Sequence, residues 1–212
     1  MKVYFISGLG ADKRIFKYVS LPDGFEAVCL DWLTPVKNEE LSGYALRMAE
    51  KIDQSEPFIL AGLSLGGMIA SELSEKIKPV FTLLISSVPI SSQLPPYIRF
   101  ASKLNLLKIV PIGFLKSTAL AKRLLQVMSH ADVKLMSEML KDTNPFFIRW
   151  GMKAISRWKN ETLPIPYAHI HGTWDRVLPI RYTHPTRTIK RGGHAMIINK
   201  VDEINDWLKE EL

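Results

Sequence analysis

The sequence predicts an α/β fold, with one mainly parallel β-sheet, helices on both faces and a helical insertion. Two observations predict the sheet. Short, almost wholly apolar segments are typical of strands buried on both faces, and they alternate with amphipathic segments of helical spacing. A third observation predicts the insertion, because this alternation stops between Pro89 and Pro164. The chain of 212 residues is long enough to bury such a core without disulfides or a structural metal.

Six segments are expected to form the strands of the sheet. Each is short and apolar, and glycine, proline or polar residues bound it, which is the pattern of a buried strand. In chain order they are residues 2–7, 25–30, 57–61, 80–86, 166–171 and 186–190. Because helical segments separate most of them, we expect the strands to run mainly parallel.

Three core helices are expected, at residues 42–55, 68–77 and 201–212. The first opens on a serine, and its apolar residues recur with the spacing of one helix face. The last shows the same amphipathic spacing, with Ile204 and Trp207 on one side. These segments supply the helices that cover the sheet.

Residues 90–162 are expected to form a helical insertion, which leaves residues 1–89 and 163–212 as the core. Prolines divide the insertion into short helices, and no segment in it has the pattern of a strand. Residues 94–160 hold twelve Lys and Arg against three acids, whereas the rest of the chain holds sixteen against eighteen. The net charge of +7 therefore belongs to the insertion, which suggests a separate architecture there.

The basic insertion has several open interpretations. Its cations could lie on solvated helix faces, attract an anionic substrate, or dock the protein on an anionic surface. Nucleic acid is not expected as a partner, because no recognisable binding motif or aromatic stacking platform accompanies the charge. The apolar residues of the insertion could line an acyl pocket or fill a small core. The sequence does not indicate an oligomeric state.

The composition excludes several classes of protein. Hydrophobic residues make up 47% of the chain and charged residues 23%, which excludes wholesale disorder. The single cysteine, Cys29, cannot form an internal disulfide, which excludes a cystine-rich secreted domain and fits a reducing compartment. Cys29 is expected in the core, on the second strand. No apolar stretch is long enough to span a membrane, so a cytoplasmic location is expected.

One segment has the pattern of a serine nucleophile. Residues 62–66 read Gly-Leu-Ser-Leu-Gly, with Ser64 at the centre, an apolar strand before it and a helix after it. The two glycines allow a sharp strand-to-helix turn that lifts the serine hydroxyl above the sheet. The alternative is a glycine-rich turn with a buried serine. A serine hydroxyl is a weak nucleophile, so it needs a base within hydrogen-bonding distance and an acid that orients the base.

Candidates for the base and the acid follow the last two predicted strands. His194 stands in an Arg-Gly-Gly-His sequence after the sixth strand, and Asp175 stands in a loop that begins His-Gly after the fifth. Open α/β sheets place their sites at the carboxyl ends of the strands. We therefore expect Ser64, Asp175 and His194 to meet at that edge.

These three motifs, in this order, resemble the α/β-hydrolase family from residue 2 to residue 212. The insertion stands in the place of the family's helical cap. The resemblance implies a catalytic triad of Ser64, Asp175 and His194, and it implies no metal and no organic cofactor. The chain starts directly at the strand before the family's oxyanion loop, so a compact version of the fold is expected.

The resemblance also implies an oxyanion hole, which holds the negative oxygen of a tetrahedral intermediate. One donor would be the backbone N–H of Leu65, the residue after the nucleophile. The other would be the N–H of Leu9, in the loop after the first strand. Ser7 stands where the family often has a histidine. Because the donor is a backbone amide, this departure need not impair catalysis.

The function that the resemblance implies is acyl transfer through an acyl-enzyme. A small carboxylic ester or thioester is the expected substrate, and the basic insertion would favour an anionic one. Two alternatives stay open. A lyase could use the same serine and histidine to abstract a proton, and a non-catalytic member could use the cap pocket only to bind a ligand. The fold does not fix the substrate.

Four other histidines and one aspartate offer alternative functional roles. His169 and His171 lie on one side of the fifth strand, but no cysteine or glutamate cluster joins them, so a metal site is not expected. His171 is expected to brace the loop of Asp175 instead. Asp31, after the second strand, is a rival acid without a motif around it. The two remaining histidines, at positions 130 and 184, are expected at the surface.

Overall fold

The computed structural model describes residues 1–103, 113 and 129–212. A six-stranded sheet forms its centre, and every pair of neighbouring strands is parallel. The strands are β1 (Lys2–Ile6), β2 (Glu26–Leu30), β3 (Phe58–Leu63), β4 (Phe81–Ile85), β5 (Tyr167–Gly172) and β6 (Arg187–Ile189). All six predicted strands are present, and each end lies within two residues of its predicted position.

The order of the strands is β2-β1-β3-β4-β5-β6. The chain starts at β1, places β2 on one side of it and then continues on the other side with β3. The connections therefore diverge between β1 and β3, and open α/β sheets bind ligands at the carboxyl ends of such strands.

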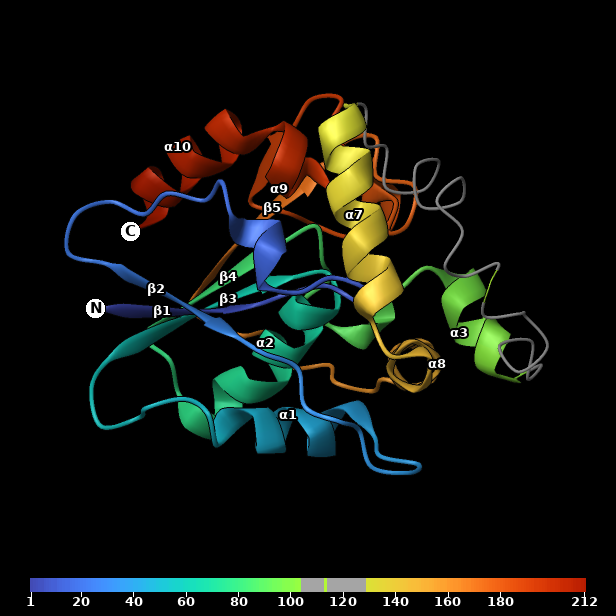
Figure 1. Cartoon of the computed structure of the whole chain (residues 1–212). Coiled ribbons are helices and arrows are strands. Elements are labelled where there is room, and N and C mark those ends of the chain that lie inside the picture. The colour runs from blue at the N-terminus through green and yellow to red at the C-terminus, as the bar shows by residue number, and fades with distance from the viewer. Residues whose placement is uncertain (104–112, 114–128) are drawn as a thin grey trace.

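Helices cover both faces of the sheet (Figure 1). α1 (Leu41–Ala49) and α2 (Leu65–Ile77) cover one face, and η1 (Lys13–Phe16), α9 (Met196–Asn199) and α10 (Val201–Glu211) cover the other. Successive β1 side chains point to opposite faces, so Tyr4 packs with the α1 and α2 residues whereas Phe5 packs with η1 and α10 residues. The two faces thus carry two separate apolar cores.

Two of the predicted helix bounds were wrong. α1 ends at Ala49 rather than at residue 55. The carboxylate of Asp53 accepts hydrogen bonds from the N–H and the hydroxyl of Ser55, and such a local side-chain turn competes with helix continuation. α2 begins at Leu65, three residues before its predicted start, because the turn at Ser64 leads directly into the helix.

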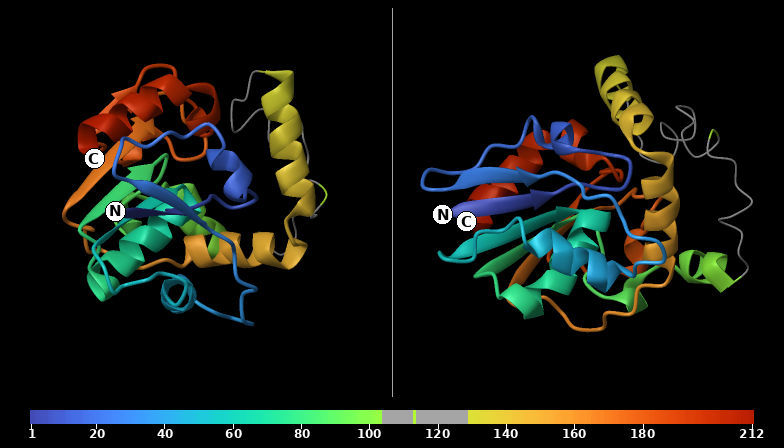
Figure 2. Two further views of the ribbon diagram at one scale, coloured as in Figure 1. Left: turned by 60° about the vertical axis from the view of Figure 1, so that its left-hand side comes forward. Right: turned by 60° about the horizontal axis from the view of Figure 1, so that its bottom comes forward.

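The elements that the structure describes between β4 and β5 are all helices. They are η2 (Ser91–Gln93), α3 (Pro96–Lys103), α7 (His130–Asp142) and α8 (Pro145–Ser156), and residues 104–112 and 114–128 of the predicted helical insertion lie outside the described residues. The side chains of Ser129 and Asn144 cap the first turns of α7 and α8. α7 and α8 stand beyond the carboxyl ends of the strands (Figures 1 and 2).

The insertion packs directly on the core. Phe147 and Trp150 of α8 join the apolar cluster of α1 and α2, and Met136 and Met139 of α7 join the cluster on the opposite face. The described helices of the insertion therefore touch both cores of the sheet. A short η3 (Ile180–Tyr182) precedes β6.

The edge position of β2 corrects one prediction. Cys29 was expected in the core, but it is half-buried, because an edge strand has a neighbour on one side only. Its partial burial raises the pKa of the thiol. In the described part of the chain, no helix is long and apolar enough to cross a membrane.

Candidate active site

Ser64 lies in a sharp turn between β3 and α2. Its φ of 53° and ψ of −114° belong to a region that a residue with a side chain seldom adopts. A β-carbon on Gly62 would overlap the carbonyl oxygen of Gly66, and one on Gly66 would overlap the carbonyl oxygen of Ile6. The turn is therefore possible only because glycine stands at both positions. Ser64 itself is partly exposed.

Two hydrogen bonds hold this turn against β4. The Ser64 N–H donates to the carbonyl oxygen of Ile85 over 3.0 Å, and the hydroxyl of Ser87 donates to the carbonyl oxygen of Ser64 over 2.7 Å. Ser87 is completely buried. No local motif indicated this role for Ser87, because the contact depends on how β3 and β4 pair.

His194 reaches Ser64 from the loop after β6. Its Nε2 lies 2.9 Å from the Oγ of Ser64. The backbone N–H of Trp174 donates to the carbonyl oxygen of Gly192 over 2.9 Å, which ties this loop to the loop after β5. A β-carbon on Gly172 would overlap that same carbonyl group. Glycine at the end of β5 thus lets the two loops approach closely.

Asp175 completes the arrangement from the loop after β5. Its Oδ2 lies 2.7 Å from the Nδ1 of His194, and its Oδ1 accepts the N–H groups of Val177 and Leu178, both over 2.8 Å. Burial alone would raise the pKa of this carboxyl, but the electrostatic interaction with His194 and hydrogen bonds from His171 and His194 hold the pKa well below its usual range. Ser64, His194 and Asp175 therefore meet as the sequence predicts, with the carboxylate ionised.

The match to known families agrees with this geometry. A family model described as "Alpha/beta hydrolase family" matches residues 3–207. The chain belongs to the alpha/beta hydrolase family. Among curated proteins, no sequence matches this chain.

Solved structures of several esterases share this alpha/beta hydrolase fold. A thermophilic esterase from Thermogutta terrifontis with malate bound has a TM-score of 0.76 and 16% identity, over 99% of this chain and 88% of that one. A lipase-esterase related protein from Clostridium acetobutylicum has a TM-score of 0.74 and 16% identity, over 100% and 94%. An esterase from Exiguobacterium antarcticum has a TM-score of 0.74 and 14% identity, over 98% and 90%. At these identities the likeness concerns the fold alone.

The loop after β1 lies beside Ser64, where hydrolases of this family bind an oxyanion. We call residues 7–12 the β1 loop. A β-carbon on Gly8 would stand 3.4 Å from the Cβ of Ser64, which places the residue before Leu9 next to the nucleophile candidate. Leu65 is the first residue of α2, and helix geometry leaves its N–H without an intrahelical partner. In the described part of the chain, neither of these two N–H groups donates to a backbone carbonyl.

Ser7, which stands where many relatives have histidine, closes the β1 loop. Its hydroxyl donates to the carbonyl oxygen of Ala11 over 3.0 Å, and the Ala11 N–H donates to the carbonyl oxygen of Gly8 over 3.0 Å. The indole N–H of Trp32 also donates to the Ala11 carbonyl, over 2.8 Å. The loop shape therefore depends on a serine hydroxyl and on an indole from the end of β2.

Two buried histidines lie behind Asp175. The Nε2 of His171 is 2.7 Å from the carbonyl oxygen of Leu178 and 3.3 Å from the Oδ2 of Asp175, so it contacts the acid loop as expected. Because a carbonyl oxygen only accepts, this Nε2 carries a proton, and the Nδ1 of His171 shares a hydrogen bond with the Nε2 of His169 over 3.1 Å. Burial, and then the nearby His171, lowers the pKa of His169 to about 3, so its ring is neutral near pH 7.

The other candidates lie apart from this site. His130 and His184 are exposed, as predicted. Asp31 is exposed as well, and its carboxylate lies 3.9 Å from the ammonium of Lys13. Within the described residues, no group of three or more His, Cys, Asp or Glu side chains could hold a metal ion.

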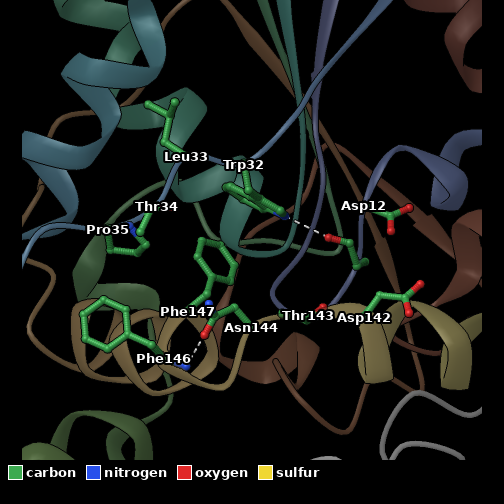
Figure 3. A pocket seen from close by; sticks show the side chains of 11 residues that line it. Asp12, Trp32, Leu33, Thr34, Pro35, Asp142, Thr143, Asn144, Phe146 and Phe147 are labelled. Carbon is green, nitrogen blue, oxygen red and sulfur yellow. Dashed lines mark hydrogen bonds between the residues drawn. The ribbon is translucent and has the colours of Figure 1, made fainter.

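A pocket of about 270 Å³ lies at the seam between the core and the insertion (Figure 3). The end of the β1 loop, the segment after β2 and the α7–α8 junction line it. Trp32 and Phe147 stand at its centre, with Asp12 and Asp142 at one side. The residues that line it do not include Ser64 or His194.

Proposed function

We propose that this chain is a serine hydrolase that cleaves a small carboxylic ester or thioester through an acyl-enzyme. One observation carries the proposal: Ser64, His194 and Asp175 form a continuous hydrogen-bonded chain, with distances of 2.9 Å and 2.7 Å. A serine hydroxyl placed against an imidazole, which is in turn oriented by a buried carboxylate, is the arrangement that makes serine nucleophilic.

Each group has a defined task in the proposed reaction. The Oγ of Ser64 attacks the carbonyl carbon of the substrate while the Nε2 of His194 takes its proton. Asp175 orients the imidazole and stabilises its charged form. The N–H groups of Leu9 and Leu65 donate to the oxyanion, and these bonds strengthen as the negative charge develops. The bond to the leaving group then breaks, and His194 protonates the alcohol or thiol.

Water completes the proposed cycle. His194 removes a proton from the water, the water oxygen attacks the acyl carbon, and the acid leaves as the proton returns to Ser64. All proton transfers use His194. The reaction needs no group beyond the side chains, two backbone amides and water.

The substrate class rests on the fold relatives that are named esterases, together with the chemistry of the site. The likeness in fold does not fix the acyl group or the leaving group. We further propose that residues 90–162 act as a cap over the site, that the twelve cations in residues 94–160 favour an anionic substrate, and that the enzyme is cytoplasmic.

Labelling with a fluorophosphonate probe tests the proposal. The matched proteins are the parent and Ser64→Ala, and intact mass reads the number of adducts. One adduct on the parent and none on the variant would support an activated Ser64. A folded parent without an adduct would contradict the proposal. A panel of short and medium acyl esters and thioesters, with the products identified by mass, then separates hydrolysis from a lyase reaction.

A further inference from the structure

We propose that α7 and α8 of the insertion hold the β1 loop in the shape that aims the Leu9 N–H at the oxyanion. Leu140, Asp142 and Gly151 are then positioning residues for the oxyanion hole. The inference rests on the proposed function, because an oxyanion forms only if Ser64 attacks a carbonyl group.

Residues of α7 and α8 pack against the β1 loop through apolar contacts. A β-carbon on Gly10 would stand 2.8 Å from the Cδ1 of Leu140, so this α7 side chain fills the space that a larger residue at position 10 would need. Gly10 has a φ of +81°, which also favours glycine. On the other side, a β-carbon on Gly151 of α8 would stand 2.5 Å from the Cδ1 of Leu9. Each contact thus depends on a glycine.

A charged contact joins the end of the loop to the end of α7. The Nη2 of Arg14 lies 2.6 Å from the Oδ2 of Asp12 and 2.7 Å from the Oδ2 of Asp142. Asp142 is the last residue of α7, where the helix dipole disfavours an anion. Its side chain is also 64% exposed, and exposed ion pairs contribute little stability. The contact does not strengthen α7, but it links the end of α7 through Arg14 to Asp12 at the end of the β1 loop.

Trp32 provides a third link. Its indole N–H donates to the carbonyl oxygen of Ala11, and its ring centroid lies 4.9 Å from that of Phe147 on α8 (Figure 3). Trp32 thus stands between the β1 loop and α8. The contacts of Leu140, Asp142 and Phe147 all come from within or beside the α7–α8 junction, so a shift of this junction would shift the loop.

A displaced oxyanion donor should affect kcat and KM differently. Its negative charge develops only in the transition state, so a misplaced donor lowers kcat and leaves KM nearly unchanged. A cap that merely encloses the substrate acts differently, because loss of its contacts raises KM. The split between kcat and KM therefore distinguishes the two roles.

The experiment compares Asp142→Asn and Leu140→Ala with Glu138→Gln. Glu138 is exposed on α7, one turn before Asp142, and its replacement makes the same change of charge. Removal of a whole oxyanion donor costs 10²–10³ in kcat, so for a displaced donor we expect kcat to fall about 10-fold in the first two variants. An alkyl boronic acid, which mimics the tetrahedral intermediate, should bind them more weakly by the same factor. Glu138→Gln should match the parent in both measurements.

Gly151→Ala provides a check that does not depend on lost contacts. Alanine is a stronger helix former than glycine, and the atom that it would overlap is the end of the Leu9 side chain rather than backbone, so thermal stability should change little. It would press on Leu9, so kcat should fall while KM holds. A variant with reduced stability but normal kcat would count against the proposal.

The outcomes separate this inference from the proposed function. If the parent neither labels with fluorophosphonate nor hydrolyses an ester, the proposed function is wrong and the inference falls with it. If the parent is active but Asp142→Asn and Leu140→Ala behave as Glu138→Gln, the inference alone is wrong. A raised KM with unchanged boronate affinity also overturns it, because the helices would then act on substrate binding only.

Discussion

The hydroxyl of Ser87 donates to the main-chain carbonyl of Ser64 over 2.7 Å and thereby fastens the strained turn of the nucleophile candidate to the end of β4. A buried hydrogen bond of this kind contributes about 1 kcal/mol to stability. The position of this bond suggests a larger effect on function. Ser64 has the unusual φ of 53°, and its hydroxyl keeps its direction only if the Ser64 carbonyl is held in place.

Ser87→Ala should therefore reduce esterase activity more than it reduces stability. We expect a loss of about 1 kcal/mol in the free energy of unfolding and roughly a 10-fold fall in kcat, since small misplacements of reacting groups are costly. Steady-state kinetics and denaturant unfolding measure the two effects.

Ser74→Ala is the matched control for this prediction. The hydroxyl of Ser74 donates to the carbonyl oxygen of Ser71 over 2.8 Å, within α2 and away from the turn at Ser64. Ser74→Ala thus removes the same kind of bond, from a serine hydroxyl to a backbone carbonyl. If both variants lose the same fraction of kcat, Ser87 has no special relation to the nucleophile.

A second prediction concerns the acid. Asp175→Asn should lower kcat by roughly 10⁴-fold, as loss of the orienting carboxylate does in serine proteases. The amide keeps the shape of the side chain but loses its charge and presents a donor or an acceptor to His194 instead of a carboxylate. Asp31→Asn tests the rival acid and should leave kcat unchanged, because the Asp31 carboxylate is exposed and pairs with Lys13. Full activity of Asp175→Asn would show that another group orients the base.

The site candidates could be predicted from the sequence because each belongs to a local motif at the end of a strand. Ser64 stands between two glycines, Asp175 follows a His-Gly pair and His194 follows a Gly-Gly pair. The supports of the site could not be predicted in this way. Ser87 and Trp32 donate hydrogen bonds to residues that follow other strands, and only the pairing of the strands brings donor and acceptor together.

The fold shows the same division between local and long-range information. Alternation of apolar strands and amphipathic helices predicted all six strands, and its interruption predicted the helices described between β4 and β5. α1 ends before the turn that the Asp53 side chain forms, and the partial exposure of Cys29 depends on β2 being an edge. Strand order depends on long-range packing, and a side-chain turn depends on polar hydrogen bonds. The spacing of hydrophobic residues along the chain reports neither.

A third prediction tests the close approach in the turn. Gly66→Ala should lower the free energy of unfolding by more than about 3 kcal/mol, because the new β-carbon would overlap the backbone of Ile6 and only a shift of β1 or α2 can relieve it. Gly43→Ala is the control. A β-carbon there would have its nearest neighbour, the Cγ of Glu39, at an ordinary 3.8 Å. In α1 this alanine should stabilise the protein by about 1 kcal/mol. Equal stabilities of the two variants would contradict the geometry of the turn.

The last prediction uses the buried His169, whose pKa burial lowers from 6.5 to about 3. As the pH falls below 6.5 the unfolded chain takes up a proton at this position while the folded chain does not, so stability is lost toward pH 3. Each unit of difference corresponds to about 1.4 kcal/mol, so this histidine should cost roughly 3 kcal/mol of stability between pH 7 and pH 4. Urea unfolding of the parent and of His169→Gln at both pH values measures it.

The glutamine variant should lose less stability on acidification than the parent, because it lacks the imidazole that takes up a proton in the unfolded chain but not in the folded chain. A glutamine amide can either donate to or accept from the Nδ1 of His171, so the bond from the His171 Nε2–H to the carbonyl of Leu178 can be kept. His184→Gln, which makes the same replacement at an exposed position, is the matched control. An identical loss of stability in the parent and His169→Gln would mean that His169 takes up its proton equally in the folded and unfolded chain, which its burial behind Asp175 argues against.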